Sequence, residues 1–179
     1  MDNISPEDKN QEDSARQMGK GMIITAWVLI FGMLVWLFGI LENNKRNPNQ
    51  NVDTQVLSSG EKQVVLKSSR FGHYIATGNI NDTKVTFLID TGASHVSIPE
   101  RVAEKIGLAQ GAPMLVSTAN GTITVFSTTL AEVSIGDIKL RDIKADINPH
   151  MEGDEILLGM SFLRDLSLTH RGDELTIRQ

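Results

Sequence analysis

The chain of 179 residues contains no cysteine. Disulfide bonds, thiolate zinc sites and cysteine nucleophiles are therefore excluded together. The compartment is left open, because a chain without thiols suits either redox environment. Positive charge is also scarce, since 17 Lys and Arg stand against 22 Asp and Glu, for a net charge of -5. Nucleic-acid binding needs a basic face, so we expect no nucleic-acid partner.

Several catalytic motifs are missing as well. No serine lies in a Gly-x-Ser-x-Gly motif, since Gly159-Met160-Ser161 lacks the second glycine. No glycine-rich phosphate-binding loop is present, because Gly19-Lys20-Gly21 precedes an apolar run instead of a nucleotide-binding fold. Arg171-Gly172-Asp173 matches an adhesion motif, but a tight turn explains it better. No His-Glu-x-x-His is present, and the histidines are scattered without metal-ligand spacing: His73, His95, His150 and His170.

One long apolar run stands out near the N-terminus. Residues Gly21 to Leu41 carry no charge and include both tryptophans, Trp27 and Trp36. As a helix the run would be about 31 Å long, enough to cross a bilayer core. A secretory signal peptide has a shorter apolar core and a small-residue cleavage site, which the polar residues 42–45 do not offer. A buried core helix is disfavoured by so long an uncharged run. We predict a transmembrane helix at residues 21–41, in contact with membrane lipid.

The segments around this helix are polar. Residues 1–20 are predicted to be a disordered tail. The tail carries three cationic residues and the other flank two, so the positive-inside rule weakly favours a cytoplasmic N-terminus and places everything after Leu41 on the other side. Residues 42–63 are rich in Asn and Gln and are predicted to be a flexible stalk. The folded domain is then predicted at residues 64–179.

That domain has the pattern of a mainly β fold. Short alternating segments are separated by turn pairs, which is typical of a small barrel or sandwich. The predicted strands are 73–80 with 84–90, 114–119 with 122–128, 130–135 with 138–145, and 166–169 with 175–178. One helix should begin after Ser97, where Ser97 and Glu100 form a capping-box pattern, and end at Gly107. A second short helix is predicted near residues 160–164.

The chemistry centres on Asp90, which directly follows the apolar residues Phe87, Leu88 and Ile89. The plain interpretation is an aspartate that opens a turn with Thr91 and Gly92. The functional one is a carboxylate at the end of a buried strand. When two such carboxylates share a proton, one can act as a base on water while the other acts as an acid on a carbonyl.

These residues resemble a known family. Asp90-Thr91-Gly92-Ala93-Ser94, together with Ile156-Leu157-Leu158-Gly159, is similar to the retropepsin-like (retroviral-type) aspartic proteases, and the layout of span, stalk and domain resembles their bacterial single-pass membrane-anchored members. The resemblance implies a small closed β-barrel with one or two short helices, no cofactor and no metal. It also implies a location in the inner (cell) membrane, with the protease domain on the periplasmic or extracytoplasmic side.

The resemblance further implies a role for each matching residue. Asp90 would be the catalytic carboxylate, supported by Thr91, Gly92 and Ala93 in the active-site loop. Leu158 and Gly159 would pack beneath that loop. The flap that closes over substrate would be the hairpin tip formed by Thr118, Ala119, Asn120, Gly121 and Thr122.

The number of catalytic motifs predicts the quaternary structure. The chain contains one Asp-Thr-Gly and no Asp-Ser-Gly, which is half of a two-carboxylate site. A symmetric homodimer would supply the second Asp90, and in the family the chain ends pair at that interface, which makes Leu175 to Gln179 the candidate strand. The predicted activity is an aspartic endopeptidase that cleaves peptide or protein substrates and favours mildly acidic pH. The alternatives are a catalytically silent, dimerising peptide-binding module on a membrane stalk and an accessory subunit of an envelope complex.

Overall fold

The computed structural model describes residues 22–39, 46–118 and 121–179, which belong to two compact units, Met1–Asn43 and Asn44–Gln179. In the first unit the described residues form one helix, Met22–Gly39, long and apolar enough to cross a membrane. Its large side chains are exposed, among them Trp27 at 66% and Trp36 at 67%, as a helix surrounded by lipid requires. By length and composition this helix is compatible with a single-pass anchor or with a signal sequence. The predicted tail at residues 1–20 lies outside the described residues.

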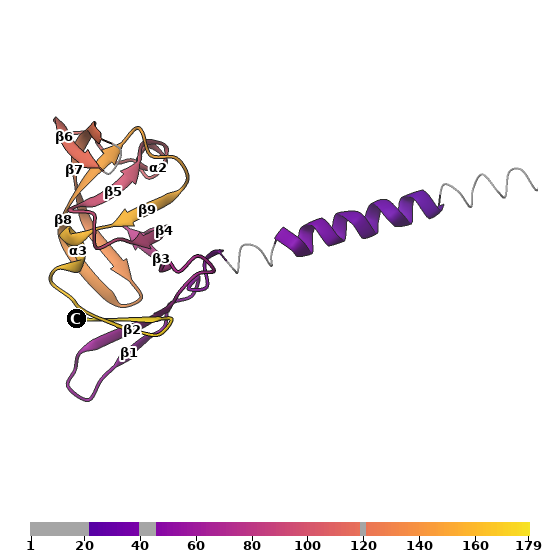
Figure 1. Cartoon of the computed structure of the whole chain (residues 1–179), viewed down its shortest axis with the longest axis horizontal. Coiled ribbons are helices and arrows are strands. Elements are labelled where there is room, and N and C mark those ends of the chain that lie inside the picture. Colours follow the sequence, from indigo (N-terminus) through magenta and orange to yellow (C-terminus); the bar gives the residue numbers. More distant parts are fainter. Residues whose placement is uncertain (1–21, 40–45, 119–120) are drawn as a thin grey trace, which may run out of the picture. The chain divides into compact units, whose positions relative to one another are not determined.

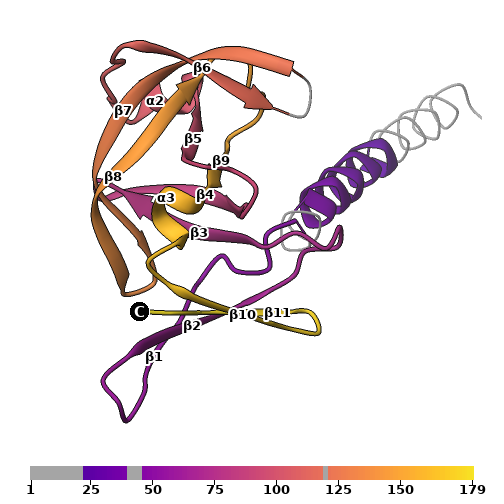
Figure 2. The same ribbon diagram turned by 60° about the vertical axis from the view of Figure 1, so that its left-hand side comes forward.

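Most of the second unit is a single sheet that closes on itself. Its strand order is β3-β4-β9-β5-β8-β7-β6, and a further pairing of β3 with β7 completes a ring (Figures 1 and 2). Two short helices, α2 (Glu100–Lys105) and α3 (Met160–Leu163), accompany this ring of strands, and the predicted mainly β fold is confirmed. The strands are β3 (Ile75–Ile80), β4 (Thr83–Ile89), β5 (Val96–Pro99), β6 (Pro113–Thr118), β7 (Gly121–Ile135), β8 (Ile138–Asn148) and β9 (Glu155–Leu158).

The predicted turns at Asn81-Asp82, Gly136-Asp137 and Arg171-Gly172-Asp173 are confirmed, whereas Asn120 of the predicted Asn120-Gly121 turn lies outside the described residues. Ile80 pairs with Thr83 across Asn81 and Asp82, both of which have positive φ, +45° and +66°, as a type I′ hairpin turn requires. Gly136 has a φ of +56° in the turn between β7 and β8. Gly172 has a φ of +63° in the turn after Arg171, so the Arg-Gly-Asp sequence is a hairpin turn.

Two local predictions were wrong. Residues 122–128 and 130–135 are not separate strands but parts of β7, because no Gly or Pro interrupts the segment between them and its β-branched residues favour an extended backbone. Ser97 does not cap α2: the residue at the helix N-cap is Pro99, no side chain caps the helix, and Ser97 lies in strand β5. The predicted end of the helix is confirmed, since Gly107, with a φ of +71°, follows the C-cap residue Ile106.

A second sheet of four strands lies at the opposite end of the domain from the β6–β7 hairpin (Figures 1 and 2). Its order is β1-β2-β11-β10, and its buried residues Val64, Leu66, Leu175 and Ile177 share one core with the barrel. Its strands are β1 (Thr54–Val56), β2 (Lys62–Lys67), β10 (Ser167–Arg171) and β11 (Glu174–Arg178).

The place of β11 corrects the expectation that Leu175 to Gln179 pairs with a second chain. β11 is hydrogen-bonded on one side to β2 and on the other to β10 of the same chain. Both edges of this strand are therefore occupied, and the edge strands of the sheet are β1 and β10. A partner strand has no backbone edge to pair with along β11.

The predicted stalk at residues 42–63 is also corrected, because the structure folds its later part into the domain. The second unit begins at Asn44. Asn49 is 6% exposed, and its side chain donates hydrogen bonds to the carbonyl oxygens of Lys67 (2.8 Å) and Ile75 (2.7 Å) and accepts one from the N–H of Lys67 (2.7 Å). Strand β1, also in this segment, pairs with β2. The polar composition suggested a coil, but the buried side-chain amide of Asn49, with its three hydrogen bonds to the backbone, orders this segment.

Candidate active site

Asp90 lies at the end of β4, in a turn that its own carboxylate stabilises. The N–H of Gly92 donates a 2.9 Å hydrogen bond to Oδ1 of Asp90, and the N–H of Ala93 donates to its carbonyl oxygen at 3.3 Å. Asp90 and Ala93 are half-buried, whereas Thr91 and Gly92 are exposed in this single chain. The turn thus presents a carboxylate at the surface next to exposed residues that a second chain can reach.

Strand β9 holds this turn from beneath. β4 and β9 run parallel, with Ile89 opposite Leu158, and the N–H of Asp90 donates to the carbonyl oxygen of Leu158 at 3.2 Å. Leu158 is fully buried. A methyl group on Gly159 would overlap the carbonyl oxygen of His95 and lie 2.6 Å from that of Ala93, so only glycine fits. The structure therefore brings Leu158 and Gly159 into contact with the Asp90 loop.

The start of α3 ties the same loop on its other side. The N–H groups of Met160 and Ser161 donate to the carbonyl oxygens of Ala93 (2.7 Å) and Ser94 (3.0 Å). The Ser161 hydroxyl accepts a 3.0 Å hydrogen bond from the N–H of Val96. From the sequence, Ser161 was weighed only as a nucleophile; this supporting contact was not predicted, because it joins residues 65 positions apart.

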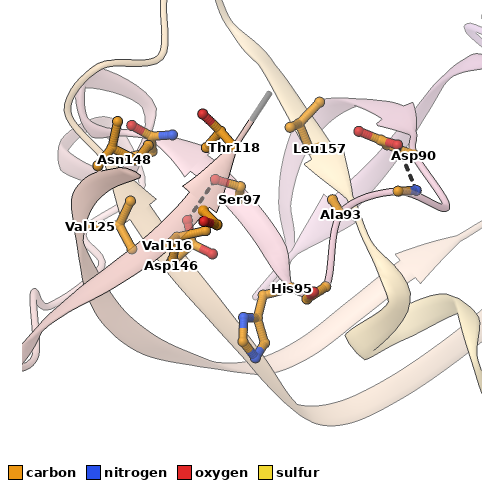
Figure 3. Close-up of a pocket in the computed structure, with 14 residues that line it drawn as sticks. Asp90, Ala93, His95, Ser97, Val116, Thr118, Val125, Asp146, Asn148 and Leu157 are labelled. Carbon is orange, nitrogen blue, oxygen red and sulfur yellow. Dashed lines mark hydrogen bonds between the residues drawn. The ribbon is translucent and has the colours of Figure 1, made fainter. Parts of the chain in front are cut away.

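A cavity of about 360 Å³ opens beside Asp90 (Figure 3). Its walls come from the Asp90 loop, from β5, β8 and β9, and from the two arms of the β6–β7 hairpin. It is lined by Asp90, Gly92, Ala93, Ser94, His95, Ser97, Val116, Ser117, Thr118, Ile123, Val125, Asp146, Asn148 and Leu157. The hairpin that carries the predicted flap residues therefore forms one wall of the space next to the carboxylate.

The predicted flap residues are only partly described. Thr118 and Gly121 pair across the end of the hairpin, and the Thr118 hydroxyl donates to the Gly121 carbonyl oxygen at 2.8 Å. Gly121 has a φ of +116°, a conformation that favours glycine, and Thr122 is exposed. Ala119 and Asn120 lie outside the described residues. Of the five, Thr118 lines the cavity.

A second carboxyl group in the cavity was not predicted. Asp146 of β8 is 5% exposed, and the Ser97 hydroxyl donates a 2.6 Å hydrogen bond to its Oδ1. Burial raises the pKa of Asp146, and the Ser97 hydrogen bond and the nearby His95 offset part of that effect. The sequence signal was weak, because Ser97 and Asp146 lie 49 positions apart and meet only through the pairing of β5 with β8. In the described part of the chain, no group of three His, Asp or Glu side chains has the arrangement of a metal site.

Comparison with known proteins agrees with this geometry. The family model described as "gag-polyprotein putative aspartyl protease" matches residues 76–165, which contain Asp90, the cavity and Gly159. The chain belongs to the retropepsin-like aspartic protease family. A crystal structure of a retropepsin-like aspartic protease from Rickettsia conorii superposes with a TM-score of 0.54 at 25% sequence identity, covering 72% of this chain and 94% of that one.

Two curated relatives of this family member have no described activity. The "Uncharacterized protein in cobV 5'region" of a Sinorhizobium species is 38% identical over 125 residues, which are 68% of this chain and 54% of the relative. An uncharacterised protein of Rickettsia prowazekii (strain Madrid E) is 30% identical over 104 residues, which are 56% of this chain and 44% of the relative. The chain thus spans about half the length of the curated relatives it matches.

Proposed function

We propose that this family member is an aspartic endopeptidase that works as a homodimer, with one Asp90 from each subunit. The observation that carries the proposal is the position of Asp90: a single carboxylate in a glycine-supported turn at the mouth of a cavity that a β-hairpin helps to enclose. One Asp-Thr-Gly per chain gives half a site, and the exposed Thr91 and Gly92 leave this face accessible to a second copy.

The proposed chemistry uses the two carboxyl groups and one proton between them. The ionised carboxylate takes a proton from water while the oxygen of that water attacks the peptide carbonyl carbon. The protonated partner gives its proton to the carbonyl oxygen. Collapse of the resulting diol returns the C=O bond, and a proton passes to the departing amine nitrogen. Because one proton must stay on the pair, the rate should favour mildly acidic pH, and a rate that keeps rising above neutral pH contradicts the scheme.

The roles of the neighbouring residues follow from their contacts. Gly92 and Ala93 shape the turn that carries the carboxylate, and Leu158 and Gly159 fix it from beneath. We assign Thr91 to bracing the two loops across the dimer and the β6–β7 tip, residues 118–122, to the flap.

We further propose that the helix at Met22–Gly39, within the predicted span 21–41, anchors the enzyme in the inner (cell) membrane, with its N-terminus cytoplasmic and its protease domain extracytoplasmic. Confinement to a plane would raise the local concentration of partner subunits. The measurement is alkaline extraction of membranes, followed by protease accessibility in intact and opened cells. We expect the domain to stay in the membrane fraction, and an added protease to digest it while the cytoplasmic membrane is still intact. Release into the soluble fraction as a shortened chain would instead indicate a cleaved signal sequence.

The catalytic proposal is tested with the full chain in detergent micelles and denatured casein as substrate. Wild type and Asp90→Asn are compared from acid to neutral pH at concentrations at which dimers form. Asparagine preserves the acceptor for the Gly92 N–H but cannot act as the base. We expect cleavage by wild type and none by the variant. A folded, dimeric wild type that cleaves nothing would favour the silent peptide-binding module.

A further inference from the structure

Ser97 and Asp146 belong to one row of residues that crosses the cavity wall. Successive pairings place Leu88 opposite Leu157, Leu157 opposite Ser97, and Ser97 opposite Asp146. Neighbouring strands lie about 4.8 Å apart, so Asp146 lies about 14 Å from β4 along the sheet, and closer in a straight line because the sheet curves into a ring. Figure 3 shows Asp90 and the Ser97–Asp146 pair on either side of Leu157. The pair therefore lies along the cavity, at a distance that an extended peptide spans with a few residues.

Asp146 is a buried acid with no Lys or Arg partner among the described residues, and His95 of the same cavity wall lies close enough to lower its pKa. It is 5% exposed, and among the described residues no Lys or Arg nitrogen lies within ion-pair distance of it. Its described hydrogen bond is the one that Ser97 donates to Oδ1. No hydrogen bond to Oδ2 is described, and Asp146 lines the cavity. Taking an unpaired carboxylate out of water is costly, and a cation that enters the cavity would offset that cost.

The apolar side chains of the cavity wall suit a substrate side chain with an apolar stem. Val116 and Val125 from the β6–β7 hairpin and Leu157 from β9 line the cavity around the Ser97–Asp146 pair. Lysine and arginine combine an alkyl stem with a charged end. A purely apolar side chain would leave the carboxylate desolvated and unpaired, and an acidic side chain would add repulsion.

We propose that Asp146, held by Ser97, is a specificity-determining residue that selects a lysine or arginine side chain of the substrate within about four residues of the cleaved bond. The inference rests on the proposed function, because it names the substrate class of that same cavity. Asp146 is not placed in the chemistry: it lies about three strand spacings from β4 and contacts Ser97 instead of Asp90.

The test measures preference, not activity alone. Full-length enzyme in detergent is incubated with a random decapeptide library, and the cleaved sites are read by mass spectrometry. Peptides that carry lysine or norleucine, which has the four side-chain carbons of lysine without the ammonium group, at the selected position are then compared by kcat/KM. Wild type should enrich Lys and Arg at one position and prefer lysine over norleucine by about ten-fold or more, an ordinary size for a desolvated charge pair. Asp146→Asn should lose most of this ratio.

Asp142→Asn is the matched control, because Asp142 lies on the same strand, is exposed, and has a φ of +55° that asparagine adopts readily. It should keep the wild-type ratio. Circular dichroism checks folding, and Asp146→Ser replaces Asp146→Asn if the latter does not fold. Active wild type and Asp146→Asn with the same lysine-to-norleucine ratio overturn the inference and leave the proposed function standing.

A binding measurement separates the two proposals when nothing is cleaved. The lysine and norleucine decapeptides, labelled with a fluorophore, are titrated with Asp90→Asn and with Asp90→Asn/Asp146→Asn, and anisotropy gives both affinities. Tighter binding of the lysine peptide that disappears in the double variant supports the subsite even if the protein is not a protease. Equal affinities, or no binding of either peptide, overturn it.

Discussion

The N–H of Asp90 donates a 3.2 Å hydrogen bond to the carbonyl oxygen of Leu158, which connects the carboxylate-bearing turn to a strand that lies far along the chain. Parallel pairing of β4 with β9 sets this contact, since Ile89 lies opposite Leu158. At the next residue, Gly159, a Cβ atom would meet the carbonyl oxygens of His95 and Ala93 in the Asp90 loop. The position of the carboxylate thus depends on a residue without a side chain.

Gly159→Ala tests that dependence. The new methyl group would overlap the carbonyl oxygen of His95 and lie 2.6 Å from that of Ala93, and because Gly159 has an ordinary φ of -89°, the cost is steric overlap and not backbone strain. We expect the free energy of unfolding to fall by about 1–3 kcal/mol, or more if the backbone does not adjust. Urea denaturation of the detergent-solubilised chain measures it. Gly60→Ala is the control, with open space but a φ of +87°. A loss at Gly159 no larger than at Gly60 would contradict tight packing beneath the loop.

Asn49→Ala tests whether the segment before β1 belongs to the folded domain. The variant removes one acceptor and two donors that pair with the backbone of Lys67 and Ile75. Each buried group left unpaired costs about 1–3 kcal/mol, so the free energy of unfolding should fall by at least that amount. Asn51→Ala, at an exposed position of the same segment, should change it by less than about 0.5 kcal/mol. Equal, small effects of both substitutions would mean that the segment is a loose stalk.

The sequence predicted those features of the fold that depend on neighbouring residues. Asn81-Asp82 and Gly136-Asp137 specify their hairpins through backbone conformations that few other residues adopt. The motif at Asp90 and the Leu158-Gly159 pair were found because the family combines them. Ser97 was wrongly predicted to cap the helix. A serine three residues before a glutamate is the pattern of a capping box, but the same pattern occurs where a strand runs directly into a helix. Only the pairing of β5 with β8, which local sequence does not encode, turns its hydroxyl toward Asp146.

Asp146 should also make stability depend on pH. Burial raises its pKa in the folded chain, so between the ordinary aspartate pKa and the raised value the folded state holds more protons than the unfolded state. The free energy of unfolding therefore falls as pH rises through this window, with a slope of at most about 1.4 kcal/mol per pH unit for one proton. Below the ordinary pKa both states are protonated and this penalty is absent.

Asp146→Asn replaces the titratable carboxyl group with a neutral amide of the same shape. Urea denaturation of wild type and variant from pH 4 upward should show the wild type losing stability relative to the variant as pH rises. The difference compares the two chains at each pH, so titrations of groups that do not interact with Asp146 cancel. Curves that stay parallel over the whole range would mean that the carboxyl group of Asp146 is as well solvated in the folded chain as in the unfolded one.

Subunit mixing tests the shared active site most directly. Wild type and Asp90→Asn are mixed in equal amounts at constant total concentration in detergent, equilibrated until subunits exchange, and assayed on denatured casein. If both Asp90 residues are needed, only wild-type pairs are active, and the mixture should keep about one quarter of the wild-type rate, because random pairing makes one dimer in four fully wild type. A mixture that keeps about half of the rate would show that each chain works alone, and would contradict a site built from one Asp90 of each subunit.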